Sequence, residues 1–118
     1  MAYVDAFLAA VPKDSREAYT EFSRLSHEAF RDHGALNIVE CWADDVPDGK
    51  LTSMPMAVKA GPDEIVALSW IVWPDKATRD EGFRRIMDDP RMSPERNPMP
   101  FDGQRMIFGG FTPILGTP

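Results

Sequence analysis

With 118 residues, 43% of them hydrophobic and 27% charged, the chain suffices for one domain with its own core but not for a separate ligand-binding domain. Its 13 Lys and Arg against 19 Asp and Glu give a net charge of −6, so we expect neither nucleic acid nor a membrane as a partner. No segment approaches the roughly 20 apolar residues that cross a bilayer. The single cysteine, Cys41, excludes an internal disulfide and a zinc site built on several thiolates.

The N-terminal segment shows no export signal. Residues 1–5 contain no basic residue, and Asp5 interrupts their short apolar run, so we expect no secretory signal peptide. The lone cysteine also fits a reducing compartment. These features together predict a cytoplasmic protein.

The chain begins with a predicted strand and a predicted helix. Residues 2–11 alternate small or aliphatic side chains with larger ones and stop at Pro12, which is typical of a strand. Asp14 and Glu17 fit a capping box, so a helix is expected over residues 14–33. Its predicted apolar stripe consists of Ala18, Tyr19, Phe22, Leu25, Ser26, Ala29 and Phe30.

The middle of the chain is rich in turn formers. Residues 36–42 form a short β-prone run, and the segment 44–50 that follows predicts an exposed loop. Prolines and glycines in residues 51–63 predict no long element there, only a brief extended piece at 56–59.

The last part of the chain predicts strand, helix and strand again. Residues 65–73 are almost continuously apolar and end at Pro74, and Asp75 is expected to cap a helix that stops before Pro90. The predicted apolar stripe of this helix consists of Ala77, Phe83, Ile86 and Met87. A proline-rich loop then leads to a final strand over residues 105–115.

The order β-α-β-β-α-β predicts an α+β fold of the ferredoxin-like plan, a single domain over residues 1–118 with a four-stranded antiparallel sheet and two helices on one face. Both faces of the strands are apolar. Strand 65–73 places Val66, Leu68, Trp70 and Val72 on one side and Ile65, Ala67, Ile71 and Trp73 on the other. Because two helices cover only one face, we expect a homodimer in which two sheets face each other.

Four polar residues lie inside otherwise apolar predicted strands: Asp5, Glu40, Ser69 and Arg105. A buried charge needs a partner, so we expect Asp5 or Glu40 to pair with Arg105. Two interpretations stay open. The pair is either the floor of a pocket that orients a polar ligand or a salt bridge that fixes strand register.

Aromatic and basic side chains supply the other candidates. Trp42, Trp70 and Trp73 could line a ligand cavity with Ser69, or could simply be core residues. A catalytic base, if there is one, would be His27, Asp5 or Glu40.

Other site types find no support. His27 and His33 lie six residues apart on the predicted helix and share no face, so we expect no metal site. Gly109 and Gly110 lie within a predicted strand, which argues against a phosphate cradle. We expect no cofactor.

Several blocks along the chain form a recognisable set: Tyr3-Val4-Asp5, Val11-Pro12-Lys13, His33-Gly34-Ala35-Leu36, Asp44-Asp45-Val46-Pro47-Asp48-Gly49-Lys50, Ser69-Trp70-Ile71-Val72, Asp89-Pro90-Arg91-Met92 and Met99-Pro100-Phe101-Asp102-Gly103. In these blocks the chain resembles the YbaA-like family of uncharacterised bacterial proteins over nearly its whole length. The resemblance implies the dimeric α/β-barrel fold shared with antibiotic-biosynthesis monooxygenases, and it brings no catalytic residues to transfer. Some relatives carry a label invoking signal recognition particle RNA, which the acidic balance and the lack of RNA-binding motifs do not support.

Three functions therefore remain open at this point. The first is a homodimer that binds a small molecule in a cavity between sheet and helices. The second is a cofactor-free enzyme, similar to the monooxygenases, that deprotonates an aromatic substrate for reaction with oxygen. The third is a structural or protein-interaction dimer that docks partners through the loops 44–50 and 90–104.

Overall fold

The computed structural model describes residues 1–118 and contains one antiparallel sheet with the strand order β2-β3-β1-β4. The strands are β1 (Tyr3–Pro12), β2 (Asn37–Trp42), β3 (Glu64–Trp73) and β4 (Ile107–Phe111). The helices are α1 (Arg16–Asp32), α2 (Met54–Ala57) and α3 (Lys76–Ile86), with short 3-10 turns η1 (Lys13–Ser15), η2 (Pro90–Met92) and η3 (Gly103–Arg105). The predicted α+β, ferredoxin-like arrangement is confirmed.

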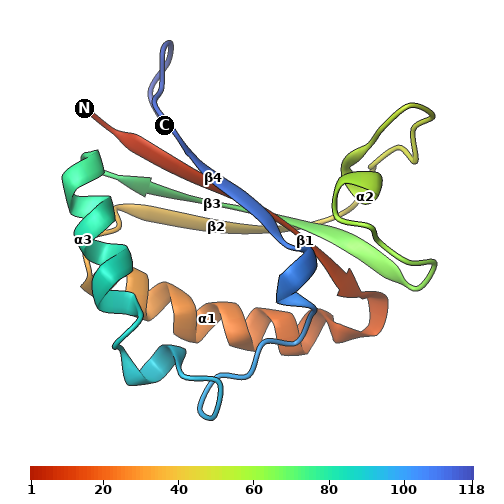
Figure 1. Ribbon diagram of the computed structural model, residues 1–118, viewed down its shortest axis with the longest axis horizontal. Coiled ribbons are helices and arrows are strands. Elements are labelled where there is room, and N and C mark those ends of the chain that lie inside the picture. Colours follow the sequence, from red (N-terminus) through yellow and green to blue (C-terminus); the bar gives the residue numbers. More distant parts are fainter.

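The two longer helices, α1 and α3, lie on one side of the sheet. In Figure 1, α1 runs beneath the strands and α3 stands at one end of them, whereas the short α2 lies at the opposite end. The register assigns the faces: Asp5 pairs with Ile71, and Ala6 with Trp70. Side chains of Asp5 and Ile71 therefore share the helix side, and those of Ala6 and Trp70 share the other side, called here the open face.

Several predicted element ends need correction. The capping box at Asp14 is wrong, since Asp14 lies in η1 and α1 begins after Ser15 without a side-chain cap. The extended piece at 56–59 is also wrong. Ser53 accepts a hydrogen bond from the Met56 amide there and starts α2.

Of the last two predicted elements, the helix starts where it was predicted to start, and the strand does not. Asp75 caps α3 as predicted, because its Oδ1 accepts a hydrogen bond from the Thr78 amide at 2.7 Å. The final strand is shorter than predicted. It begins at Ile107 because Arg105 belongs to η3, and it ends at Phe111, before Pro113.

The buried faces of the helices also differ from the predicted stripes. On α1 the buried residues are Tyr19, Ser23, Ser26 and Ala29, whereas Ala18 is exposed. On α3 the predicted Ala77 and Met87 are exposed, whereas the predicted Phe83 and Ile86 pack inward together with Gly82. The α1 face is thus more polar than an aliphatic stripe, which places hydroxyl groups against the sheet.

The open face is partly uncovered. At one end, Val58 after α2 is buried against Ala10 and Val66. Along the edge strand β4, Ile107 is 43% exposed and Phe111 58% exposed. The sheet therefore keeps an apolar surface that no element of this chain covers.

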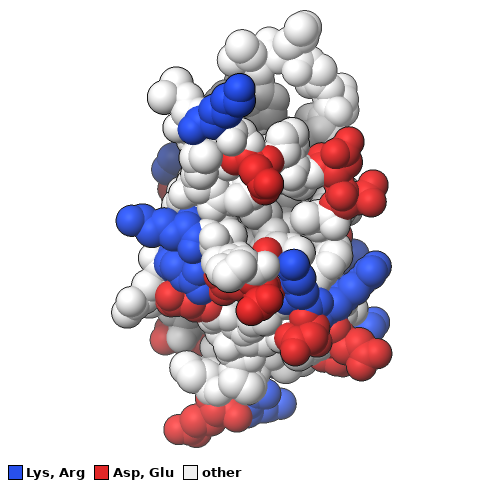
Figure 2. Space-filling model, turned by 90° about the vertical axis from the view of Figure 1, so that its right-hand side faces the viewer, with Lys and Arg blue, Asp and Glu red and all other residues white.

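No helix of the structure combines the length and apolarity needed to cross a membrane. Figure 2 shows acidic and basic side chains interleaved on one face, with no extended area of a single sign.

Candidate functional site

A cavity of about 160 Å³ lies between α1 and the helix side of the sheet. Twelve of its 16 lining residues are hydrophobic. Ala9 and Ala67 form part of the floor, and Phe22 and Phe30 line it from α1. The small alanine side chains leave the space that larger residues would fill, so the sheet itself creates the cavity.

Three polar side chains meet at the wall of this cavity. The Tyr19 hydroxyl donates to Glu40 Oε1 at 2.6 Å, and His27 Nε2 lies 2.9 Å from Glu40 Oε2. We call Tyr19, His27 and Glu40 the triad. Because a carboxylate only accepts, His27 Nε2 carries a proton, and Nδ1, which has no partner in the structure, is an acceptor when the ring is neutral.

The fold brings the triad together from two elements. Tyr19 and His27 are eight residues apart on α1, slightly over two turns, so both reach the sheet along one side of the helix. Glu40 lies on β2 opposite Ser69 of β3. The carboxylate therefore points from the sheet toward the helix, into the gap that α1 spans.

The triad is polar but only partly solvated. The side chains of His27 and Glu40 are 21% and 25% exposed, and Tyr19 is buried. Burial raises the pKa of the Tyr19 hydroxyl well above its usual value, and the negative charge of Glu40 and the hydrogen bond to it raise it further. Tyr19 is therefore a hydrogen-bond donor at neutral pH.

The roof of the cavity comes from the irregular segment between α3 and β4. Met92, Met99 and Phe101 of this segment line the cavity. The buried amide of Asn97 holds the segment on α1, because its Nδ2 donates to the Phe22 carbonyl at 3.2 Å. Flexible methionines next to aromatic rings can adapt to ligands of different shape.

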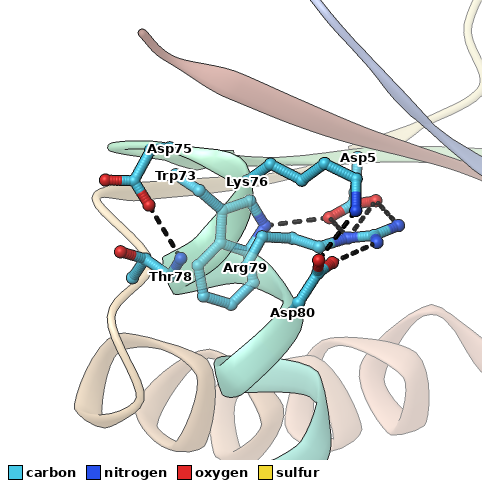
Figure 3. A network of polar contacts seen from close by, with 7 residues as sticks. All are labelled: Asp5, Trp73, Asp75, Lys76, Thr78, Arg79 and Asp80. Atoms are coloured by element: carbon cyan, nitrogen blue, oxygen red, sulfur yellow. Dashed lines mark hydrogen bonds and ion pairs between the residues drawn. The ribbon is translucent and has the colours of Figure 1, made fainter.

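Asp5 belongs to a different cluster at the end of the sheet. It is 2% exposed, accepts from the Trp73 indole Nε1 at 2.9 Å, and accepts from Arg79 Nη2 at 2.9 Å and Nε at 3.1 Å. Figure 3 shows Arg79 reaching from α3 to the carboxylate of Asp5, with Trp73 beside them. The Arg79 guanidinium also stacks over the Tyr3 and Phe83 rings, at 5.2 and 4.8 Å from their centroids.

The predicted pairing of Arg105 with Asp5 or Glu40 is wrong. Arg105 Nη1 and Nη2 each donate to Glu64 at 2.7 Å, and its Nε donates to Asp102 at 3.0 Å. These hydrogen bonds to Arg105, with that of the Gly61 amide, lower the pKa of Glu64 to about 2. Arg105 thus ties η3 to the start of β3, outside the cavity.

The three tryptophans and Ser69 do not all lie at the cavity either. Ser69 lines the cavity, and Trp42 packs at its edge against the Tyr19 ring, with the ring centroids 5.9 Å apart. Trp73 is fully buried core, and Trp70 faces the open side of the sheet. Of the predicted pocket residues, the structure therefore brings His27, Glu40 and Ser69 together at the cavity.

Sequence reasoning missed two residues that matter here. Tyr19 belongs to the predicted apolar stripe of residues 14–33, and the signal that marks its polar role is the pair of serines on the same helix face, Ser23 and Ser26. Arg79 lies in the charged stretch 76–81 of the chain, where nothing in the sequence marks it as the partner of Asp5.

Histidine and acidic residues do not gather elsewhere into a site. No group of three or more His, Cys, Asp or Glu side chains is arranged to hold a metal ion. His33 Nε2 lies 2.8 Å from Asp89 Oδ2, which also binds Arg91. This pair holds the end of α1 to the segment that follows α3.

Comparison with known proteins is consistent with the resemblance inferred from the sequence. Residues 2–103 match the family described as "Protein of unknown function (DUF1428)". The chain is 52% identical over 115 residues to a protein of Escherichia coli K12 named "Uncharacterized protein YbaA", and the match covers 98% of each chain. A protein of Shigella flexneri with the same name matches to the same extent.

Proposed function

Because the chain belongs to the DUF1428 family, whose members are described only as proteins of unknown function, we propose from its own residues that it binds a small, mainly apolar molecule in the cavity between α1 and the sheet. The observation that carries this proposal is the meeting of an apolar cavity with a polar triad on its wall. A cavity of about 150 Å³ lined by apolar side chains accepts a benzene-sized ring.

The triad determines which charge and which hydrogen-bonding group the ligand can carry. The carboxylate of Glu40 disfavours an anion beside it, whereas His27 Nδ1 is free to accept a hydrogen bond. The ligand that fits best is therefore a neutral ring with one hydrogen-bond donor. Phenol is the simplest probe of this class.

Phenol binding can be followed by the amide and side-chain NMR signals of the protein. We expect saturable shifts at cavity residues with phenol and none with benzoate, which has the same ring and a negative charge. Ala67→Val and Ala67→Leu should weaken binding in that order, because they fill the floor of the cavity. Ala57→Leu on the exposed side of α2 is the matched control. Phenol shifts that survive both Ala67 variants would contradict the proposal.

A second candidate function is catalysis without a cofactor at the same place. The hydrogen bond between His27 and Glu40 favours it, because a carboxylate that accepts from Nε2 orients the ring so that Nδ1 can take a proton from a substrate. His27 would accept the proton of an aromatic hydroxyl, by analogy with the cofactor-free monooxygenases that the chain resembles. With hydroquinone, the deprotonated ring would give two electrons, and with them its two protons, to dioxygen, so the products are benzoquinone and hydrogen peroxide.

Oxygen consumption with hydroquinone tests this candidate. Turnover should fall sharply in His27→Ala and persist in His33→Ala, which removes the histidine that lies outside the cavity. Unchanged turnover in His27→Ala would remove that residue from the role of base. An enzyme-independent rate throughout would leave ligand binding as the function.

We also propose that the open face is closed by a second copy of the chain. The exposed apolar residues of β4, Ile107 and Phe111, lie on this face beside Leu8 and Val4. Two-fold pairing places identical apolar faces together, and a stable contact of this kind buries about 800 Å² of each partner. The loops 44–50 and 90–104 support a docking function less well than the open face supports a dimer. Part of the loop 90–104 packs on α1 as the roof of the cavity.

A further inference from the structure

A second hollow adjoins the cavity where α1 lies beside Glu40 of β2 and Arg91 of η2. This groove has a volume of about 880 Å³, and only one of its ten lining residues is hydrophobic. Tyr19, His27 and Glu40 line both the cavity and the groove. The triad is therefore the common wall of an inner apolar compartment and an outer polar one.

The groove carries opposite charges in equal number. Its basic residues are Arg24, Arg31 and Arg91, and its acidic residues are Glu28, Asp32 and Glu40. This balance gives the groove no net attraction for an anion or a cation. Side chains that donate and side chains that accept hydrogen bonds lie next to each other, and hydroxyl or amide groups, which do both, match such a surface.

The three arginines are not equally free to bind a ligand. Arg91 binds Asp89 and Asp32, at 2.6 and 2.7 Å, and Arg24 pairs with Glu21 at 3.3 Å. Arg31 is exposed and takes part in no ion pair. Its guanidinium is therefore the donor of the groove that a ligand can engage without breaking an ion pair.

We propose that the ligand has two parts: a ring-sized apolar head in the cavity, and an uncharged tail, rich in hydroxyl or amide groups, that lies in the groove against Arg31. The bond between the two parts passes the triad. This inference rests on the proposed binding of a small molecule in the cavity and adds the chemical class of that molecule.

Four probes separate the two parts: phenol, the N-glucoside N-phenyl-β-D-glucosylamine (called the glucoside below), glucose and phenyl phosphate. The N–H of this glucoside keeps a hydrogen-bond donor next to the ring, as the triad requires. We expect the glucoside to bind about threefold to tenfold more tightly than phenol, since one or two hydrogen bonds to the tail contribute that much. Glucose alone should not bind measurably. Phenyl phosphate should bind no better than phenol, because the groove carries no net positive charge.

Arg31→Ala tests the role of the groove directly. The variant should bring the affinity for the glucoside down to that for phenol and leave phenol binding unchanged. Arg85→Ala is the matched control, because Arg85 is an exposed arginine on α3, on another helix and outside both hollows.

The outcomes distinguish the two proposals. If phenol binds but the glucoside binds no more tightly, or if phenyl phosphate binds most tightly, the two-part ligand is wrong while cavity binding stands. If phenol does not bind, the proposed function fails. A glucoside gain that survives Arg31→Ala contradicts the placement of the tail.

Discussion

Among single residues, Tyr19 gives the clearest pH signature. Its hydroxyl is held protonated by burial and by Glu40, with a pKa above the usual value of 10.0. In the unfolded chain the hydroxyl ionises at about pH 10, while the folded protein still holds the proton. The unfolded state therefore binds fewer protons above that pH, and the free energy of unfolding falls as pH rises.

We expect this loss of stability to be steeper in the wild type than in Tyr19→Phe, which has no proton to release. Urea unfolding at several values between about pH 9 and pH 11 measures it. The other tyrosine, Tyr3, is retained in both proteins and so cancels in the comparison. If the free energy of unfolding falls equally with pH in the two proteins, the Tyr19 hydroxyl does not keep its proton in the folded state above pH 10.

Asp5 is the residue whose loss should be most costly. Asp5→Ala leaves the Arg79 guanidinium and the Trp73 indole without their acceptor, and breaking a buried pair in this way costs about 3–5 kcal/mol. We place the cost toward the low end, because the Arg79 side chain is 21% exposed. Chemical denaturation measures the change.

Two further variants serve as comparisons for Asp5→Ala. The double variant Asp5→Ala with Arg79→Met should recover part of the loss, since no unpaired charge remains. Lys76→Ala, which breaks the exposed pair with Asp80, should cost less than about 1 kcal/mol. A cost for Asp5→Ala no larger than that for Lys76→Ala would contradict a buried ion pair.

Among the elements, α3 depends on a close approach to the sheet. A Cβ on Gly82 would lie 2.6 Å from the ring of Trp73, which is fully buried and cannot move aside freely. Gly82→Ala should therefore destabilise the protein by about 1–3 kcal/mol, the usual cost of overpacking.

The same substitution on an exposed part of a helix would have the opposite sign, because alanine is the better helix former by about 1 kcal/mol. Ala77→Gly, exposed on the same helix, measures that propensity in place. Thermal unfolding of both variants is the test. A Gly82→Ala protein more stable than the wild type would show that α3 does not pack so closely.

The elements were largely predictable because periodicity determines them. The continuous apolar run of β3 and the cap at Asp75 follow from local rules, and both are observed. Register was not predictable to the same degree. β4 begins opposite Leu8, so Arg105 lies beyond Leu8 and away from Asp5, and the two cannot meet at about 3.4 Å per residue. The sequence offers His27 and Glu40 only as separate candidates, because the packing of α1 on β2 is what joins them with Tyr19.

At the scale of the whole molecule, the open face predicts self-association. Phe111→Glu places a charge among the exposed apolar side chains of β4, and we expect sedimentation to show a dimer for the wild type and a monomer for the variant. Ile114→Glu is the control, because Ile114 is 98% exposed in the C-terminal tail beyond the sheet. A wild-type monomer at all concentrations would contradict the pairing of sheets.

The cavity and the triad lie on the helix side of the sheet. The most direct test of ligand binding is to locate a bound ring there. A crystal soaked in 4-bromophenol reports the position of the ring through the anomalous signal of bromine. We expect one peak between α1 and the sheet, with the phenol oxygen within hydrogen-bond distance of the triad. Full occupancy elsewhere on the protein, with none between Ala67 and the roof formed by Met92, Met99 and Phe101, would contradict it.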